Sequence, residues 1–232
     1  MPTSRNTSAR PLIAAAVAAI VLTGAMIGIG DLIVHMWSHD WPFTAEDGVN
    51  RTLQAHRTHT LDDVTAVFST GASTFYAVAA TALAVLVVWW VFRTWREPLF
   101  LAGSVMLETA VFLVTTLAVD RARPAVVHMD AAPPTSSFPS GHTAASLALY
   151  GGIAVLASRR GVRWPVWILL LIPLAVGTSR MYRGMHHPSD VLAALLLGAA
   201  CLAIMHRALL ADPPVLHRRA VNSGRWKSAS RA

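Results

Sequence analysis

The chain has 232 residues, of which 54% are hydrophobic and only 13% are charged, and its formal net charge is +7. This composition is typical of a protein with several membrane-spanning helices and excludes an ordinary water-soluble domain. The single cysteine, Cys201, lies inside an apolar stretch, which excludes disulfides and cysteine-based metal sites. The length predicts one membrane domain, residues 1–210, followed by a basic cytoplasmic tail, residues 211–232.

The first apolar stretch runs from Leu12 to Gly30 without a charge. At about 1.5 Å per helical residue it is long enough for a hydrocarbon layer of roughly 30 Å. A signal peptide is the alternative, but the stretch is long and lacks a clear small-residue cleavage site. The following connection, His35 to Gly71, contains helix-start patterns at Thr44 and Thr60. We therefore expect a first span and then two short helices on the membrane surface.

Five further apolar stretches complete the predicted bundle. They run from Ala72 to Phe92, Pro98 to Val119, Thr143 to Ser158, Trp164 to Thr178 and Val191 to Met205. Glu108 lies near the middle of one of them, where a carboxyl group is costly and usually faces the bundle interior. A proton relay, a substrate contact and a structural hydrogen bond are all open roles for it. The fold class is therefore all-α: a polytopic membrane protein with six transmembrane helices and short interfacial helices between the first two spans.

The arginines and the lysine are unevenly divided between the two sides of this bundle. With the N-terminus inside, one side carries thirteen of them and the other six, which obeys the positive-inside rule. We therefore expect a multi-pass protein of the cell inner (plasma) membrane with both termini cytoplasmic. The excess positive charge then has a topological explanation, and no nucleic-acid partner is predicted.

Three polar segments lie at the ends of apolar stretches that this topology places on the extracytoplasmic side. In one of these segments, Pro139-Ser140-Gly141-His142, Pro139 ends any preceding helix and Ser140 is a favourable N-cap. Gly141 permits close approach of the backbone to a ligand because it lacks a Cβ atom. The free N–H groups of a helix that begins there would bind an anion beside His142. The three segments are Arg123-Pro124, Pro139-Ser140-Gly141-His142, and Ser179-Arg180 with His186 and Asp190.

Arginines are frequent in these segments although the topology should deplete them there, which indicates an anionic ligand such as phosphate. Arg123 and Arg180 present planar forks suited to the oxygens of a phosphoryl group. Two histidines allow covalent transfer: His186 attacks phosphorus while His142 protonates the leaving oxygen and later activates water. Asp190 is expected to accept the Nδ1–H of His186. This chemistry predicts no cofactor and no metal.

Together the three segments resemble the signature motifs of the type 2 phosphatidic acid phosphatase superfamily. That group includes lipid phosphate phosphatases, bacterial undecaprenyl-pyrophosphate phosphatases and the soluble vanadium haloperoxidases. The resemblance implies a six-helix membrane core and a phosphohistidine mechanism. It also implies that the nucleophile is His186 rather than His187, oriented by Asp190, with His142 as the acid. The phosphate-binding residues that it implies are Arg123, Ser140, Gly141 and Arg180.

One position departs from the family pattern. The first motif normally opens with a lysine seven residues before its arginine, and here that position is Thr116. Arg121 is the candidate that replaces the missing phosphate-binding cation. Altered selectivity and a reduced or absent activity are the alternatives.

The residues and the resemblance together predict a membrane lipid-phosphate phosphatase that acts at the outer face. Its expected substrate is an isoprenoid or glycerolipid phosphate or pyrophosphate, with undecaprenyl pyrophosphate favoured. A lipid-to-acceptor phosphotransferase would use the same residues, and a degenerate binding-only or transport protein is the non-enzymatic alternative. The expected partners are the lipid substrate and the bilayer, and the sequence makes no prediction of oligomeric state.

Overall fold

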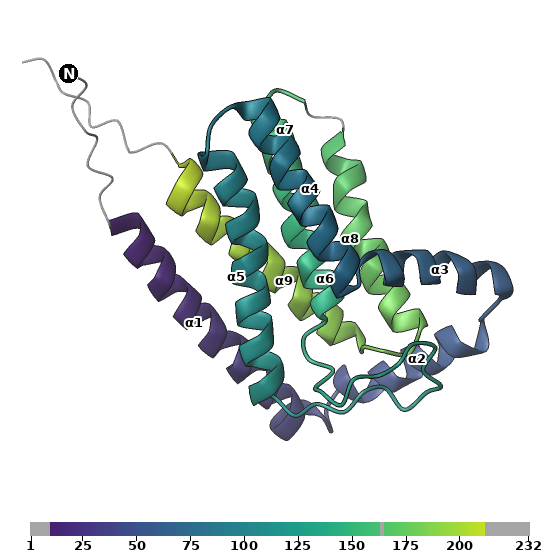
Figure 1. Cartoon of the computed structure of the whole chain (residues 1–232). Helices are drawn as coiled ribbons and strands as arrows, with labels where there is room; N and C mark the ends of the chain where they lie inside the picture. Colours follow the sequence, from purple (N-terminus) through teal and green to yellow (C-terminus); the bar gives the residue numbers. More distant parts are fainter. Residues whose placement is uncertain (1–9, 163–164, 212–232) are drawn as a thin grey trace, which may run out of the picture.

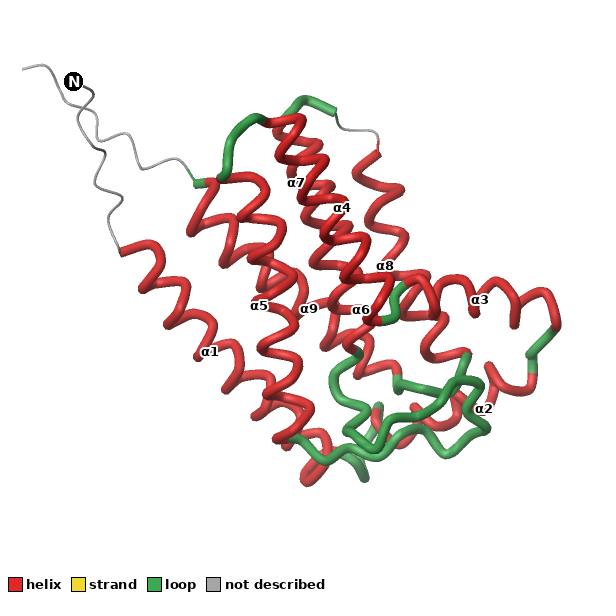
Figure 2. Tube along the Cα trace, in the orientation of Figure 1, coloured by secondary structure: helices red, strands yellow, loops and turns green. Residues whose placement is uncertain are grey.

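The computed structural model describes residues 10–162 and 165–211. Every regular element within these ranges is helical, which confirms the all-α class (Figures 1 and 2). Residues 1–9 and nearly all of the predicted basic tail, residues 212–232, lie outside the described ranges. The helices are α1 (Arg10–Leu32), α2 (Glu46–Ala55), α3 (His59–Gly71), α4 (Thr74–Phe92), α5 (Arg96–Ala118), α6 (Gly141–Ser146), α7 (Gly152–Arg159), α8 (Pro165–Tyr182) and α9 (Pro188–Met205).

The starts of the helices that carry site residues follow from local sequence. Pro188 is the first residue of α9, and a reciprocal capping box joins His187 to Asp190 there. α6 begins directly after Ser140, the predicted N-cap, whose hydroxyl group lies 3.0 Å from that of Thr143. The predicted start pattern at Thr60 is wrong by one half-turn, because the side chain of Thr58 caps α3 by accepting the N–H of Leu61 at 3.3 Å.

In the part of the chain that the structure describes, four helices are long and apolar enough to cross a membrane. They are α1 with its continuation (Arg10–Trp37), α4, α5, and α9 with its continuation (Pro188–Leu210). The other two predicted spans correspond to α8, whose apolar part Val166–Tyr182 is shorter, and to α6 and α7, which a π-helical turn at Leu147–Gly151 joins into one rod. The six-span count therefore stays a prediction.

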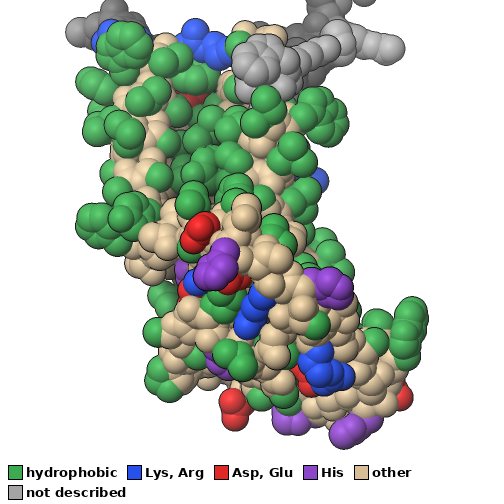
Figure 3. All heavy atoms as spheres, turned by 90° about the vertical axis from the view of Figure 1, so that its right-hand side faces the viewer, with side chains coloured by type: hydrophobic (Ala, Val, Ile, Leu, Met, Phe, Trp, Pro, Cys, Tyr) green, Lys and Arg blue, Asp and Glu red, His purple; other side chains and the backbone are tan. Residues whose placement is uncertain are grey.

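The bundle has an apolar outer surface and a core at the contacts of α5 and α9 with their neighbours. Buried residues of these helices, such as Phe100, Leu101 and Leu197, are fully enclosed. Large apolar side chains on α1 and α4 are instead exposed, which suits a surface that lipid tails cover. Figure 3 shows hydrophobic side chains over the upper part of one face, while most acidic, basic and histidine side chains gather below.

The predicted connection between the first two spans contains two helices, α2 and α3, at the lower end of the bundle (Figure 1). Their position on the membrane surface remains a prediction. α2 is tied to the end of α8 and to the loop before α9 by Asn50, whose side-chain amide donates to the carbonyl oxygens of Met181 and His186, each at 3.1 Å. This short helix therefore supports the backbone on which His186 stands.

Candidate active site

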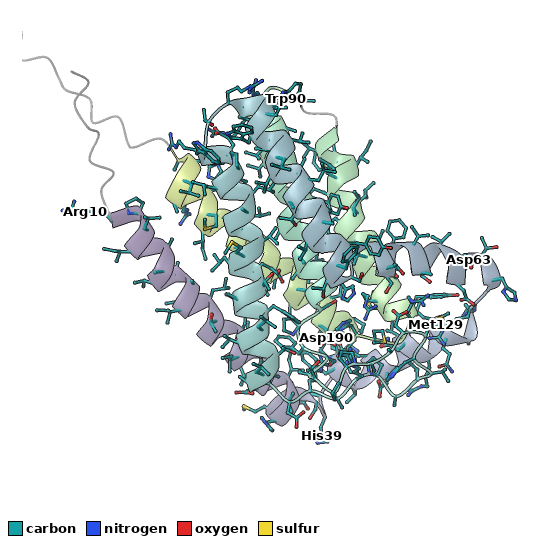
Figure 4. All side chains as sticks on the ribbon, in the orientation of Figure 1. Arg10, His39, Asp63, Trp90, Met129 and Asp190 are labelled. Atoms are coloured by element: carbon teal, nitrogen blue, oxygen red, sulfur yellow. The ribbon has the colours of Figure 1, made fainter. Side chains whose placement is uncertain are left out.

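The three predicted polar segments meet at one end of the bundle. The N–H of Ser140 donates to the carbonyl oxygen of Asp190 at 3.2 Å, and the N–H of Met129 donates to that of Arg183 at 3.0 Å. In Figure 4, Asp190 and Met129 lie at the lower end of the bundle, whereas Trp90 of α4 lies at the upper end. The helices therefore bring residues that are 50 or more positions apart in the chain to a common place.

A cavity of about 1170 Å³ opens at this place. Five of the residues predicted for the site line its polar end: Arg123, Gly141, His142, Arg180 and His186. Most of its remaining wall comes from apolar or small side chains of α4 and α5, among them Ala77, Val78, Val85, Val105, Met106 and Leu113. One continuous space thus joins a strongly cationic end to an apolar wall between two membrane-spanning helices.

The ring of His186 is held by a backbone carbonyl group. Its Nδ1 lies 2.7 Å from the carbonyl oxygen of Ser137 and 3.8 Å from Oδ2 of Asp190. The expected hydrogen bond to Asp190 is therefore replaced by one to Ser137. Because a carbonyl oxygen can only accept, Nδ1 carries the proton and Nε2 keeps its lone pair. Nothing in the sequence marks Ser137 for this contact, since any residue type could provide the carbonyl oxygen.

Burial keeps this imidazole uncharged. His186 has only 4% of its surface exposed, and desolvation lowers its pKa below the ordinary 6.5. The charge of Asp190 acts in the opposite direction but does not reverse the shift. His186 is consequently neutral at physiological pH, which is the form that a nucleophile needs.

Asp190 belongs to a fully partnered network behind His186. It accepts the N–H of His187 at 2.8 Å and is paired with Arg121. Arg121 also pairs with Glu46 of α2 at 2.6 Å and donates to the hydroxyl group of Ser189 at 2.7 Å. The structure therefore places Arg121 between two carboxylates and not beside the free donors of the cavity.

Glu46 is a site residue that the sequence did not reveal. Its Oε1 accepts the N–H of Ser189 at 2.7 Å, so it also fixes the first turn of α9. It is 7% exposed although it lies in the first turn of a helix whose sequence is polar. A carboxylate there looks like an ordinary solvated residue, because its partners come from residues far along the chain.

Arg123 and Arg180 have donors left for a ligand. In the part of the chain that the structure describes, the Nε–H groups of both are buried without a hydrogen-bond partner. Nη1 of Arg123 is anchored on the carbonyl oxygen of Met185 at 2.8 Å. Nη1 of Arg180 is anchored on Ser69 at 2.5 Å and on Asp130 at 2.6 Å. Two fixed guanidinium groups with unsatisfied donors are what an anion site requires.

The two remaining predicted residues, Ser140 and Gly141, mark the start of α6. A Cβ atom at Gly141 would lie 2.8 Å from the ring of Phe112 on α5, so the glycine is needed for packing as well as for access to the cavity. Ser140 is fully buried and its hydroxyl group is engaged by Thr143. Within the described ranges, no three His, Cys, Asp or Glu side chains cluster as metal ligands would.

Comparison with known families agrees with this geometry. The model of the family described as the PAP2 superfamily matches residues 97–212, half of the chain. The chain belongs to the PAP2 superfamily. The matched region contains all three polar segments and both histidines of the site.

Three individual proteins resemble this chain, each over a different share of its length. Undecaprenyl-diphosphatase BcrC of Bacillus subtilis (strain 168) is 35% identical over 130 residues, which is 53% of this chain and 65% of that protein. The fold is similar to the crystal structure of a transmembrane PAP2 type phosphatidylglycerolphosphate phosphatase from Bacillus subtilis, with a TM-score of 0.67, 18% identity and coverage of 85% of this chain and 94% of the other. The crystal structure of Aquifex aeolicus LpxE gives a TM-score of 0.56 at 25% identity, covering 71% and 96%.

Thr116, the departure from the PAP2 motif, lies outside the large cavity. It is 8% exposed, and its hydroxyl group donates to the carbonyl oxygen of Ser136 at 3.4 Å. It lines a second cavity of about 540 Å³ together with Arg121 and Arg123. A lysine at this position would therefore point into space beside the guanidinium groups and not into a packed core.

Proposed function

We propose that this PAP2 protein is a membrane phosphatase that hydrolyses a lipid phosphate or pyrophosphate, with undecaprenyl pyrophosphate as the favoured substrate. The observation that carries the proposal is a pair of Nε–H groups, on Arg123 and Arg180, that find no partner among the described residues and lie at the polar end of a largely apolar cavity. A ligand that satisfies both ends has a phosphate head and a hydrocarbon tail. The BcrC protein, an undecaprenyl-diphosphatase by name, supports the choice of an isoprenoid diphosphate.

The proposed reaction has two steps on the side chains of the cavity. Nε2 of His186 attacks phosphorus and the bond to the leaving oxygen breaks. His142, held in its protonated form by the negative charge of the bound phosphate, gives that oxygen its proton and becomes neutral. Water then attacks the phosphohistidine, His142 takes a proton from the water, and the P–N bond breaks to release orthophosphate and neutral His186. Arg123 and Arg180 stabilise the negative charge on the phosphoryl oxygens in both steps.

In this mechanism Arg121 is a positioning residue and does not contact phosphate. Its guanidinium group already faces two carboxylates, those of Glu46 and Asp190. With Glu46 it holds Asp190 and the first turn of α9, and thereby the loop that carries His186. This role replaces the phosphate contact that the sequence suggested for Arg121.

The proposed location is the plasma membrane, with the site on the extracytoplasmic side and both chain ends in the cytoplasm. The end of α4, the start of α5 and the end of α7 lie at the end of the bundle opposite the site (Figure 1). They carry Arg93, Arg96, Arg159 and Arg160, in agreement with the positive-inside rule. A lipid phosphate on the outer leaflet would reach the cavity between α4 and α5.

The function is tested with the purified protein in detergent and a panel of substrates: undecaprenyl pyrophosphate, farnesyl phosphate and phosphatidic acid. We expect phosphate release from at least one isoprenoid substrate, its persistence in EDTA, and its loss in His186→Ala. His56→Ala is the matched control, because His56 is exposed and the Nδ1 of its ring lies 2.8 Å from the carbonyl oxygen of Thr52 in its own helix turn, away from the residues that line the cavity. Phosphate release that His186→Ala leaves intact, or labelled phosphate trapped on a residue other than histidine, would disprove the mechanism.

A further inference from the structure

The carboxylate of Asp130 lies at the polar end of the cavity without a role in the mechanism above. Its Oδ2 is 2.6 Å from Nη1 of Arg180 and accepts the hydroxyl group of Ser69 at 2.8 Å. Its Oδ1 is 2.6 Å from Nη2 of Arg183. Asp130 also lines the cavity that contains His142 and His186. A carboxylate therefore contacts Arg180, one of the two arginines proposed to bind the substrate phosphate.

Asp130 is ionised in this setting. Burial raises its pKa, but hydrogen bonds from Arg183 and Ser69 and the charge of Arg180 outweigh burial and leave the pKa below the ordinary 3.8. A phosphate bound to the remaining donors of Arg180 would share one planar guanidinium group with this carboxylate. Two anions on one guanidinium group are only a few ångströms apart and repel each other in a site of low dielectric constant.

The geometry indicates that Asp130 is more than a fixed anchor for Arg180. The side chains of Arg180 and Arg183 are 6% and 9% exposed and come from the same helix end, whereas that of Asp130 is 25% exposed on a loop. Arg180 keeps a second anchor, because its Nη1 also donates to Ser69 of α3. Arg183 binds Asp130 through both Nε and Nη2 and would hold it without Arg180.

We propose that Asp130 is a specificity-determining residue: it competes with phosphate for Arg180 and so disfavours ligands in proportion to their negative charge. The proposal rests on the proposed phosphatase function. The carboxylate of Asp130 pairs with Arg180 and Arg183, and Arg123 lines the same cavity. Three positive charges and one negative charge leave a net positive charge that one phosphate dianion balances. A diphosphate head and released orthophosphate then bind less tightly than the three arginines alone would allow, which favours release of product.

The test compares wild type with Asp130→Asn, which removes the charge and keeps the shape. The substrates are farnesyl phosphate and farnesyl pyrophosphate, which share one tail, and orthophosphate is the inhibitor. We expect the KM of the pyrophosphate to fall about tenfold, and the KM of the monophosphate and the inhibition constant of orthophosphate, which carry less negative charge, to fall by a smaller factor. Asp62→Asn is the matched control, because that carboxylate accepts from Tyr182 at 2.7 Å and does not line the cavity; its constants should equal those of wild type.

The opposite sign would overturn the proposal. If Asp130 only orients Arg180, then Asp130→Asn weakens orthophosphate binding, raises both KM values and lowers kcat. Equal changes in KM for farnesyl phosphate and farnesyl pyrophosphate would contradict the proposed dependence on the charge of the ligand. Asp130→Ser, a second uncharged variant, decides the outcome if Asp130→Asn does not fold. Isothermal titration of each variant with orthophosphate tests Asp130 separately from catalysis, so a wild type that hydrolyses no lipid phosphate would refute the proposed function without deciding this point.

Discussion

His186 separates two regions of the site that are built in opposite ways. Behind it, on the carboxylate side, Glu46, Arg121 and Asp190 satisfy one another and the start of α9. In front of it, on the cavity side, Arg123 and Arg180 keep buried donors that have no partner within residues 10–162 and 165–211. Arg121 and Arg123 are two residues apart in the chain, yet they belong to different sides.

The difference shows that the partners of an arginine decide its role more than its place in a motif does. A guanidinium group between two carboxylates is fixed and electrically satisfied, so it can hold neighbouring groups but has little left for a ligand. Arg123, which is anchored on the backbone carbonyl oxygen of Met185, keeps its full charge for an anion, and Arg180 shares its charge with a single carboxylate, that of Asp130. The carboxylate side supplies rigidity, and the cavity side supplies affinity.

The largest effect is expected where the two sides meet. His186→Ala removes the proposed nucleophile, and we expect kcat to fall roughly a thousandfold or more because the proposed covalent intermediate forms on this imidazole. The measurement is phosphate release from farnesyl pyrophosphate, with the melting temperature as a check on folding. Activity within tenfold of wild type would show that the cavity side works without this imidazole.

Replacing either Arg121 or Arg123 by alanine should distinguish the carboxylate side from the cavity side by the quantity that each change affects. Arg123→Ala should lower kcat/KM by about two orders of magnitude and weaken orthophosphate binding, because it removes a donor from the transition state. Arg121→Ala should lower kcat and the melting temperature while orthophosphate binding changes little, since Glu46 and Asp190 lose their shared partner. Kinetics, calorimetry and thermal melting measure these quantities. Orthophosphate binding that depends on Arg121 as strongly as on Arg123 would erase the distinction.

The dependence of kcat/KM on pH reports the protonation state of His186, which borders both sides. Because burial lowers the pKa of His186, the neutral nucleophile persists as the pH falls to 6.5, and kcat/KM should decline only below that value as His186 becomes protonated. The ionisation of the substrate phosphate is measured separately by phosphorus NMR and divided out. An acidic limb centred above pH 6.5 would mean that the carboxylate side raises the pKa of His186 instead of burial lowering it.

The smallest effect is expected at Thr116. A lysine there would enter the cavity of about 540 Å³ beside Arg121 and Arg123 and add one positive charge. We expect Thr116→Lys to leave activity unchanged or to raise it by a few-fold, through tighter phosphate binding. Thr116→Met, of similar length but uncharged, is the control. A large loss with lysine and not with methionine would show that the carboxylate side does not tolerate a further cation.

The sequence predicted the parts of the site that depend on residue type and local order. The start of α9 at Pro188, the N-cap at Ser140 and the family motifs are local signals, and the structure and the family match bear them out. The contacts of Ser137 and Glu46 were missed, because a backbone carbonyl leaves no trace in residue type and a partner more than seventy positions away leaves none in spacing.

Long-range contacts also explain why Arg121 and His186 have partners other than the expected ones. Arg121 was assigned to phosphate because charge and proximity to the motif were the only information, and its two carboxylate partners come from α2 and α9. The expected contact between His186 and Asp190 was displaced for a related reason: the carbonyl oxygen of Ser137 reaches Nδ1 first. Long-range tertiary contacts thus give Arg121 and His186 partners that differ from those the sequence suggests.

The apolar wall that α4 and α5 give to the cavity determines how substrate concentration must be counted. A tail that stays among the acyl chains during catalysis never equilibrates with the aqueous phase, so encounter frequency depends on the mole fraction of substrate in the bilayer or micelle. Adding inert detergent at constant bulk substrate should therefore slow the enzyme by surface dilution, and rates from different preparations become comparable only on a two-dimensional scale.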